Sequence, residues 1–309
     1  MKKIKLLVLF LIILLSLCNI HKNMSLEDEL GDLMYEAEGM RIGVSLLNHQ
    51  QTFFQDLEGG MEEVASKTEV EITSKSADRD LYKQIEDIKV FIDEGMDAII
   101  LSPVDSEGIK TVVNQAIDSG IIVVTVDIAV NDVEVDCHIA SDNVQGGEMA
   151  GELAVKLLKE KGSVVIIDHY GITSVGDRID GFEHVINDYS DIRVIARKDS
   201  MGTKQRATEI IQELIMAKVD IDLIFAINED TSIGAYDAIK GVRNADDVII
   251  IGYDGTTLQQ QLINQDDYLK ASVIQDANEI GRQSVINAIK IYKDESVSKE
   301  VLVDVRMMD

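Results

Sequence analysis

DAIILSPVDSEGIKTVVNQAIDSGIIVVTVD (Asp97–Asp127) and DLIFAINEDTSIGAYDAIKGVRNADDVIIIGYD (Asp222–Asp254) share one pattern. Each begins with a short apolar run, continues with apolar residues at helical spacing, and ends with a second apolar run that closes on an Asp. Short apolar runs are typical of strands buried on both faces of a parallel sheet. The two stretches therefore predict two similar α/β halves in one chain.

The same alternation continues on both sides of these stretches. Helical spacing of apolar residues predicts helices, for example at Tyr82–Glu94 and Thr203–Ala217. Strands alternating with helices predict an α/β fold with two doubly wound parallel-sheet domains. The runs that predict strands are Ile42–Leu47, Glu69–Ser74, Ala98–Ser102, Ile121–Asp127, Cys137–Ala140, Ser163–Asp168, Ile192–Lys198, Leu223–Ile227, Val248–Tyr253 and Lys270–Ile274.

The charge composition restricts the classes of partner. The 309 residues include 29 Lys and Arg against 56 Asp and Glu, which gives a formal net charge of −27. An acidic surface repels both phosphate backbones and anionic lipids. We therefore expect neither nucleic acid nor a charged membrane surface as a partner.

The first residues have the composition of a targeting segment. Lysines precede the unbroken apolar run Leu6–Leu15, which is short for a membrane span and typical of a signal peptide. Cys18 follows, and a Cys at this place resembles a bacterial lipobox, in which the thiol is lipidated. Leu17 departs from the small residue usual there, so simple secretion and an uncleaved anchor stay open. We predict a signal peptide over 1–17, a tether over 18–39, and an extracytoplasmic protein whose only membrane attachment is lipidation at Cys18.

No constellation of catalytic or metal-binding residues is evident in the sequence. The five His residues lack metal-ligand spacing. The stretch Ser141–Leu158 reads G-G-x-x-x-G instead of the dinucleotide fingerprint G-x-G-x-x-G, which favours close helix packing over a phosphate site. Cys137 has no partner for an internal disulfide and is expected to be a packed thiol. We predict no catalytic residue, no metal and no cofactor.

Polar residues stand at the ends of several predicted strands. Asp127, Asn228, Asp254 and Gln275 end or follow an apolar run, and Arg178 lies in the sequence GDRIDGF. Ligands of open parallel sheets gather at the carboxyl ends of strands. Carboxylates accept hydrogen bonds, Arg donates them and amides do both, which suits a neutral polyhydroxy ligand. The alternative is that strand-end Asp and Asn residues cap helices or form turns.

Two adjacent aromatic residues, Phe53 and Phe54, follow the first predicted strand. Aromatic rings pack against apolar surface such as the C–H face of a sugar, which would explain their position. Phe54, Leu57, Met61 and Val64 also form an apolar stripe at helical spacing. A purely structural role in the core therefore stays open for both Phe residues.

Four motifs resemble those of the type I periplasmic sugar-binding proteins of ABC transporters, most closely the ribose-binding branch. Their order and spacing match from Arg41 to about Asp304, nearly the whole chain after the leader. The resemblance implies two α/β domains that close around one monosaccharide and hand it to an ABC transporter permease. The motifs are HIASDNVQGGEMAG (His138–Gly151), FAINEDTSIGAYDAI (Phe225–Ile239), IIGYDGT (Ile250–Thr256) and ASVIQD (Ala271–Asp276).

The resemblance also implies domain boundaries and ligand contacts. Sugar-binding domain 1 would comprise residues 40–141 plus 276–303, and domain 2 residues 142–275 plus 304–309, with three crossings that act as a hinge. We expect a monomer. The calcium loop of galactose-binding relatives is not visible, which agrees with the prediction of no metal. Carried over by position, the ligand contacts fall on Gln51, Phe53, Phe54, Asp127, Arg178, Asn228, Asp254 and Gln275.

Three positions depart from the ribose-binding pattern. Ile128 stands where an Arg follows the first Asp, and Gln51 replaces a shorter amide. Gly202 lies where an aromatic residue is expected, and Met201 is expected to fill part of that space. The departures favour a related monosaccharide over ribose itself.

Three other functions are alternatives to sugar transport: a sensory protein, a gene regulator and an enzyme. A ligand-presenting sensory protein for a chemoreceptor or histidine kinase has the same fold, and nothing in the sequence separates the two. A gene regulator of the lactose-repressor type needs a helix-turn-helix and a basic surface, whereas we predict a signal peptide at that place and the chain is acidic. An α/β enzyme is disfavoured because no nucleophile–base pair or phosphate loop is evident.

Overall fold

The computed structural model describes residues 31, 37–242, 247–265 and 268–309. The predicted signal peptide 1–17, Cys18 and most of the predicted tether lie outside the described residues. Ala37 is 1% exposed and Met40 is fully buried, which places both inside the folded body. Within the described ranges, no helix combines the length and the apolar composition needed to cross a membrane.

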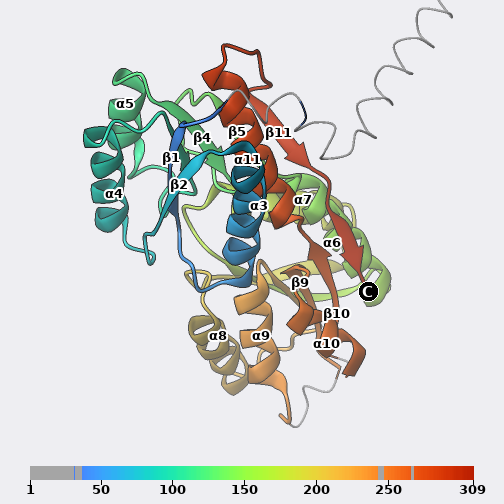
Figure 1. The fold of residues 1–309 in the computed structure, drawn as a ribbon. Helices are drawn as coiled ribbons and strands as arrows, with labels where there is room; N and C mark the ends of the chain where they lie inside the picture. The colour runs from blue at the N-terminus through green and yellow to red at the C-terminus, as the bar shows by residue number, and fades with distance from the viewer. Residues whose placement is uncertain (1–30, 32–36, 243–246, 266–267) are drawn as a thin grey trace, which may run out of the picture.

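The first of two lobes is built on a parallel sheet with the strand order β11-β5-β4-β3-β1-β2 (Figure 1). Helices α3 and α11 cover one face, and α4 and α5 cover the other. The elements are β1 Arg41–Leu46, α3 Thr52–Thr68, β2 Glu71–Ser76, α4 Leu81–Asp93, β3 Ala98–Leu101, α5 Lys110–Asp118, β4 Ile122–Val126, β5 Cys137–Ser141, α11 Ala277–Tyr292 and β11 Glu300–Val303.

The second lobe repeats this arrangement with the order β12-β10-β9-β8-β6-β7. Its strands are parallel except β12, which pairs antiparallel with β10 at the edge. The predicted doubly wound α/β fold is confirmed. The elements are α6 Asn143–Leu158, β6 Gly162–Asp168, α7 Thr173–Ile186, β7 Ile192–Asp199, α8 Lys204–Met216, β8 Leu223–Ala226, α9 Glu229–Ile239, β9 Ile249–Asp254, α10 Thr257–Gln265, β10 Leu269–Ile274 and β12 Arg306–Met308.

The chain passes between the two sheets at three places. It leaves the first sheet after β5, returns to the first lobe after β10, and leaves it again after β11. Two of these connections touch, because the N–H of Asp142 donates to the carbonyl of Val303 at 3.0 Å. The third connection lies beside them, because Ile274 at the end of β10 pairs with Arg306, just after the crossing that follows β11.

Two details of the strand prediction were wrong. The second strand begins at Glu71 instead of Glu69, because α3 runs on to Thr68 and Glu69 takes a left-handed conformation with φ 57°. Strands β11 and β12 were not predicted. They are short edge strands of four and three residues whose partners lie far away in sequence.

The largest hydrophobic cluster runs through both lobes, with α3, α11, α6 and α7 over the inner faces of the sheets. Cys137 lies fully buried in this cluster, and burial raises the pKa of its thiol to about 11. Because a thiol with this pKa stays protonated at neutral pH, Cys137 is the packed thiol that was expected.

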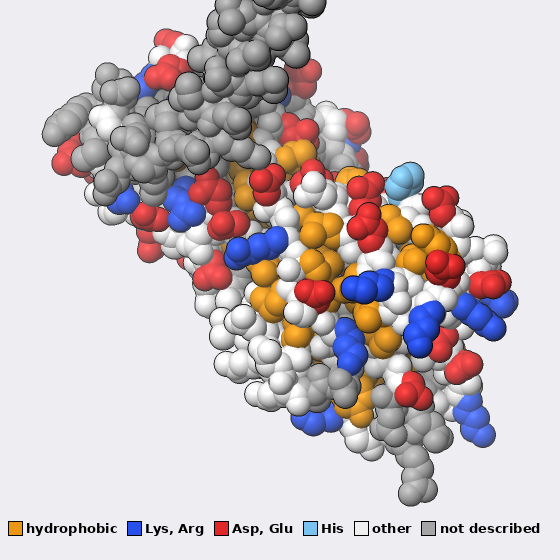
Figure 2. Space-filling model, turned by 90° about the vertical axis from the view of Figure 1, so that its right-hand side faces the viewer, with side chains coloured by type: hydrophobic (Ala, Val, Ile, Leu, Met, Phe, Trp, Pro, Cys, Tyr) orange, Lys and Arg blue, Asp and Glu red, His pale blue; other side chains and the backbone are white. Residues whose placement is uncertain are grey.

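Figure 2 shows one face of the molecule, with Asp and Glu side chains on both lobes. On the side of α6 and α7, hydrophobic side chains gather on the second lobe among Lys and Arg side chains. Among the exposed hydrophobic residues, Val144 of α6 is 45% exposed and Leu302 of β11 is 50% exposed. The hydrophobic side chains of this face therefore lie among charged side chains of both signs.

Glycines bring α6 and α7 into close contact. A Cβ on Gly147 would lie 2.1 Å from the Arg178 carbonyl oxygen, and one on Gly181 would lie 2.2 Å from the Val144 carbonyl oxygen. The Gly-rich stretch thus serves helix packing, as the sequence favoured, and it fixes the distance of α7 from α6.

We expect Gly147→Ala to lower the free energy of unfolding by about 1–3 kcal/mol, because the new methyl group forces the two helices apart. The urea midpoint measures this loss. Gly176→Ala is the matched control on α7, since a Cβ there would meet nothing within 4 Å. It should leave stability unchanged or raise it by up to about 1 kcal/mol. Equal effects of the two substitutions would contradict the packing role of Gly147.

Candidate functional site

A cavity of about 50 Å³ lies between the lobes, at the carboxyl ends of strands from both sheets. This volume holds a few water molecules, so a larger guest requires the walls to move apart. All eight residues predicted to bind the ligand line this cavity. Its wall is formed by Leu47, Gln51, Phe53, Phe54, Arg79, Asp127, Ile128, His169, Ile172, Ser174, Val175, Arg178, Ile227, Asn228, Asp254 and Gln275.

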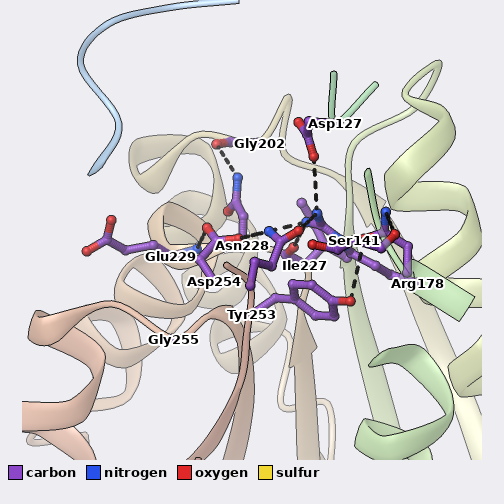
Figure 3. Close-up of polar contacts among 12 residues, drawn as sticks. Asp127, Ser141, Arg178, Gly202, Ile227, Asn228, Glu229, Tyr253, Asp254 and Gly255 are labelled. Carbon is purple, nitrogen blue, oxygen red and sulfur yellow. Dashed lines mark hydrogen bonds and ion pairs between the residues drawn. The ribbon is translucent and has the colours of Figure 1, made fainter. Parts of the chain in front are cut away.

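Arg178 of α7 is 4% exposed and forms the centre of the polar network (Figure 3). Its Nε donates to Asn143 Oδ1 at 2.8 Å, its Nη1 to the Ile227 carbonyl at 2.8 Å, and its Nη2 to Gln275 Oε1 at 3.1 Å. The guanidinium carbon stands 4.1 Å from the centroid of the Tyr253 ring, a cation–π contact. These partners fix the plane of the guanidinium.

Two carboxylates from opposite lobes face this guanidinium. Asp127 follows β4 of the first lobe, and its Oδ1 lies 3.7 Å from Arg178 Nη2. Asp254 ends β9 of the second lobe, and its Oδ1 lies 4.0 Å from Arg178 Nη1. Both distances are longer than a hydrogen bond, so neither carboxylate uses an acceptor site on Arg178, and together they more than offset its charge.

Of the two carboxylates, Asp127 has an oxygen that accepts no hydrogen bond. The residue is 6% exposed, and its Oδ1 has no hydrogen-bond partner among the described residues. Burial raises the pKa of Asp127 to about 6, although the Arg178 charge opposes this rise. An unsatisfied buried acceptor costs about 1–3 kcal/mol. A ligand hydroxyl that donates to Oδ1 would remove this cost.

Both carboxylate oxygens of Asp254 accept hydrogen bonds from protein groups. Its Oδ2 accepts from the N–H of Glu229 at 2.8 Å, and its Oδ1 accepts from Gln275 Nε2 at 2.8 Å. Burial raises the pKa of Asp254, opposed chiefly by the Arg178 charge. The carboxylate therefore has a fixed orientation, and each oxygen keeps a further lone pair for a ligand donor.

Asn228 fulfils the alternative role of a helix cap. Its Oδ1 accepts from the N–H of Thr231 at 2.9 Å as the N-cap of α9, and its Nδ2 donates to the Gly202 carbonyl at 3.2 Å. Figure 3 shows the Asn228 side chain directed toward Gly202. Asn228 thus lines the cavity with its polar groups already bonded.

Gln51 and Arg79 of the first lobe bridge to the second lobe at the cavity mouth. Gln51 Nε2 donates to Asp230 Oδ2 at 3.0 Å, while its Oε1 accepts from Asn48. Arg79 Nη1 donates to the Met201 carbonyl at 3.0 Å, and its Nη2 lies 3.8 Å from Asp230 Oδ2. These contacts hold the two lobes closed over the cavity.

Phe53 and Phe54 lie both in the hydrophobic core and in the wall of the cavity. They are 9% and 3% exposed, belong to the main hydrophobic cluster, and line the cavity. Their ring centroids are 5.3 Å apart with an interplanar angle of 86°. The two rings therefore form a rigid apolar wall on the side of the first lobe.

Sequence reasoning missed Arg79 and His169, which line the cavity from loops after β2 and β6. The expectation for Met201 was wrong, because this side chain is 63% exposed and does not line the cavity. Met201 and Gly202 lie in a tight turn, with φ of 55° and 60°. Among the described residues, no three His, Cys, Asp or Glu side chains are grouped so as to hold a metal ion.

Comparisons with known proteins agree with this geometry. The ribose import binding protein of Bacillus subtilis is 29% identical over 261 residues, which is 84% of each chain. An ABC transporter solute binding protein from Mycobacterium smegmatis, solved with bound glycerol, has a TM-score of 0.83 at 27% identity over 87% of this chain and 94% of its own. The fructose binding periplasmic domain of a hybrid two-component system has a TM-score of 0.82 at 26% identity over 87% and 90%.

A family profile extends over most of the chain. The profile of the periplasmic binding protein domain matches residues 42–296, which include both lobes except for the edge strands β11 and β12, and every residue that lines the cavity. The resemblance inferred from the four motifs is thereby confirmed at the level of the family, one of binding proteins and not of enzymes. This chain belongs to the periplasmic binding protein domain family.

Proposed function

We propose that the protein captures a monosaccharide between its two lobes and delivers it to an ABC import permease. The observation that carries the proposal is the meeting of Asp127 and Asp254, from opposite lobes, at the buried guanidinium of Arg178. The wall of Phe53 and Phe54 stands beside them. The relatives support the proposal, since they include a ribose import binding protein and an ABC transporter solute binding protein.

The charges of the site disfavour an anionic ligand. Two carboxylates, Asp127 and Asp254, face the single guanidinium of Arg178, and Arg79 is paired with Asp230 at the mouth, so these two Arg and three Asp residues sum to a net charge of −1. An anionic ligand would add to this negative charge, which is costly in a dry site. A polyol donates and accepts at every hydroxyl, so it satisfies the open acceptors of the carboxylates without adding charge.

The predicted contacts divide into two groups. We assign direct ligand contacts to Asp127, Arg178 and Asp254, with the two Phe rings on the apolar face, and we assign Gln275 to holding Arg178 and Asp254, to which its amide bonds. Gln51 and Asn228 already bond to protein groups, so we assign them to the bridge between lobes and to the cap of α9. Ile128 is 2% exposed and offers no donor to the cavity, which favours a related sugar over ribose.

We propose that the lobes are domains 40–141 plus 276–303 and 142–275 plus 304–309, which move about the three connecting segments. A few residues are sufficient to absorb the rotation in such a hinge. The contacts of Gln51 and Arg79 with the second lobe would break when the lobes separate. We further propose an extracytoplasmic monomer, tethered through lipidated Cys18.

A second candidate is a sensory protein that presents bound sugar to a receptor. The similarity to the fructose binding domain of a two-component system supports this alternative. Uptake of labelled sugar by cells that carry or lack the gene separates the two functions. Loss of uptake supports transport, whereas unchanged uptake with a lost transcriptional response supports sensing.

We expect a sugar from a panel of pentoses, hexoses and polyols, including D-ribose, D-apiose, D-fructose and glycerol, to stabilise the protein. At a hundredfold excess over Kd the gain is about 3 kcal/mol, or roughly 5–10 °C in Tm. Calorimetry with the best sugar then gives Kd.

The variant Asp254→Ala tests whether this binding occurs at the cavity. It removes an acceptor from the buried site and should abolish the shift. Asp237→Ala is the control in the same lobe, because Asp237 is 44% exposed and pairs with Lys204 on the surface. Stabilisation by no sugar in the panel would refute the proposed function, and unchanged affinity in Asp254→Ala would refute the site.

A further inference from the structure

His169 is a ring in the cavity wall that the contacts assigned above do not use. It directly follows β6 and lies in the loop before α7, the helix that carries Arg178. The side chain is half-buried, whereas its neighbour Tyr170 is 57% exposed. Of these two consecutive aromatic residues, only His169 lines the cavity.

The position of the imidazole depends on the glycine opposite. A Cβ on Gly202 would lie 2.9 Å from His169 Nδ1 and 3.4 Å from Asn228 Nδ2. Such a contact is closer than real Cβ atoms allow, so a side chain at residue 202 would displace the ring. The absence of an aromatic residue at this position therefore leaves the space that His169 occupies.

The ring nitrogens of His169 are free to bond a ligand. Neither accepts or donates a hydrogen bond within the part of the chain that the structure describes, although the backbone N–H of His169 donates to Asp168 Oδ1. Burial and the Arg79 charge lower the pKa of His169, while Asp199 and Asp168 oppose the shift. The imidazole is thus neutral at neutral pH, with one donor and one acceptor nitrogen.

The imidazole is also the one aromatic ring that the second lobe contributes to this wall, as far as the described residues go. The other side chains there are aliphatic or polar, whereas the first lobe contributes both Phe53 and Phe54. A sugar ring has two faces, and an apolar face buried without contact loses packing energy. A flat ring on the second lobe gives the ligand an aromatic partner from that lobe as well.

We infer that His169 is a specificity-determining ligand contact, whose imidazole covers the sugar from the second lobe and exchanges a hydrogen bond with one hydroxyl. This inference rests on the proposed function, because it concerns the same cavity. It predicts that the protein selects sugars with a hydroxyl within reach of the imidazole.

The test is calorimetry on three variants with the best-binding sugar of the panel above. His169→Ala removes both the ring and the hydrogen bond and should weaken binding about 10- to 100-fold. His169→Phe keeps a ring without the hydrogen bond and should weaken binding about 3- to 10-fold. Tyr170→Ala, the exposed neighbour in the same loop, is the control and should keep the wild-type Kd.

A second measurement does not depend on the stability of these variants. The imidazole NMR signal of His169 is identified as the one that is absent from the spectrum of His169→Gln. In the wild-type protein this signal should shift when the sugar is added. An unmoved signal, or a Kd for His169→Ala within twofold of that for Tyr170→Ala, would overturn the inference. The proposed function would still stand if Asp254→Ala abolished binding of the same sugar. Failure of every sugar to bind the wild type would overturn both.

Discussion

Replacing Arg178 with methionine should lower the Tm of the ligand-free protein by about 10 °C and abolish sugar binding. The substitution leaves Asp127 and Asp254 buried without the cation that faces both of them. Removing one partner of a buried ion pair costs about 3–5 kcal/mol, and each kcal/mol is worth about 2–4 °C in a chain of this size class. Scanning calorimetry measures the Tm, and titration calorimetry measures the affinity.

Two further variants separate charge from geometry at this position. Arg178→Lys keeps a cation but loses the fork that reaches Asn143, Ile227 and Gln275 together. It should recover part of the stability while binding stays weak. Arg206→Met is the surface control, since Arg206 is 44% exposed and pairs with glutamates along one face of α8. A wild-type Tm for Arg178→Met would contradict the central role of the guanidinium.

The fold could be predicted because its strands are buried on both faces. Apolar runs such as Ala98–Leu101 and Leu223–Ala226 carry this signal in the sequence without any need for a partner strand. The edge strands β11 and β12 lack the signal, since only part of each faces the core and their partners are distant in sequence. Their existence depends on tertiary pairing, which local patterns do not encode.

The same contrast holds for the cavity. Asp127, Asp254 and Gln275 could be identified because a residue that ends a strand in a parallel sheet has a predictable position. Arg79 and His169 lie on loops, whose course depends on contacts such as the one between His169 and Gly202. Strand position also did not reveal which polar groups were already bonded. Asn228 caps a helix while Asp127 retains an unpaired oxygen, although both stand at strand ends.

Because Asp127 Oδ1 is buried without a hydrogen-bond partner, we expect Asp127→Asn to raise the stability of the ligand-free protein and to weaken sugar binding. The backbone of Asp127 has φ 61°, a left-handed conformation that Asn tolerates well, so the exchange adds no strain. At pH 7 the wild-type protein must keep a charged carboxylate buried, whereas the amide is neutral. The ligand-free variant should therefore be more stable than the wild type by up to about 3 kcal/mol, the value of a two-unit pKa shift.

The sign of the pH dependence follows from the folded pKa of Asp127, which burial raises from 3.8 to about 6. Because the folded state binds this proton more tightly, the stabilising contribution is complete below pH 4 and is lost as pH rises through about 6. The stability advantage of Asp127→Asn should accordingly be large at pH 7 and vanish toward pH 4. Urea unfolding of both proteins at each pH measures the difference in their free energies of unfolding. The titration of all other groups is common to both proteins and cancels in this difference.

Sugar binding should change in the opposite direction. An ionised Asp127 accepts charge-assisted hydrogen bonds from ligand hydroxyls, and losing these weakens binding of Asp127→Asn about 100-fold at pH 7. Wild-type affinity should itself fall as pH drops below about 6, while the affinity of the variant stays flat. Asp132→Asn is the matched control, with φ 51° and a side chain that is 90% exposed, and it should change neither property. If the sugar affinity of Asp127→Asn and of the wild type depended on pH in the same way, the buried carboxylate of Asp127 would not be the group that binds the ligand.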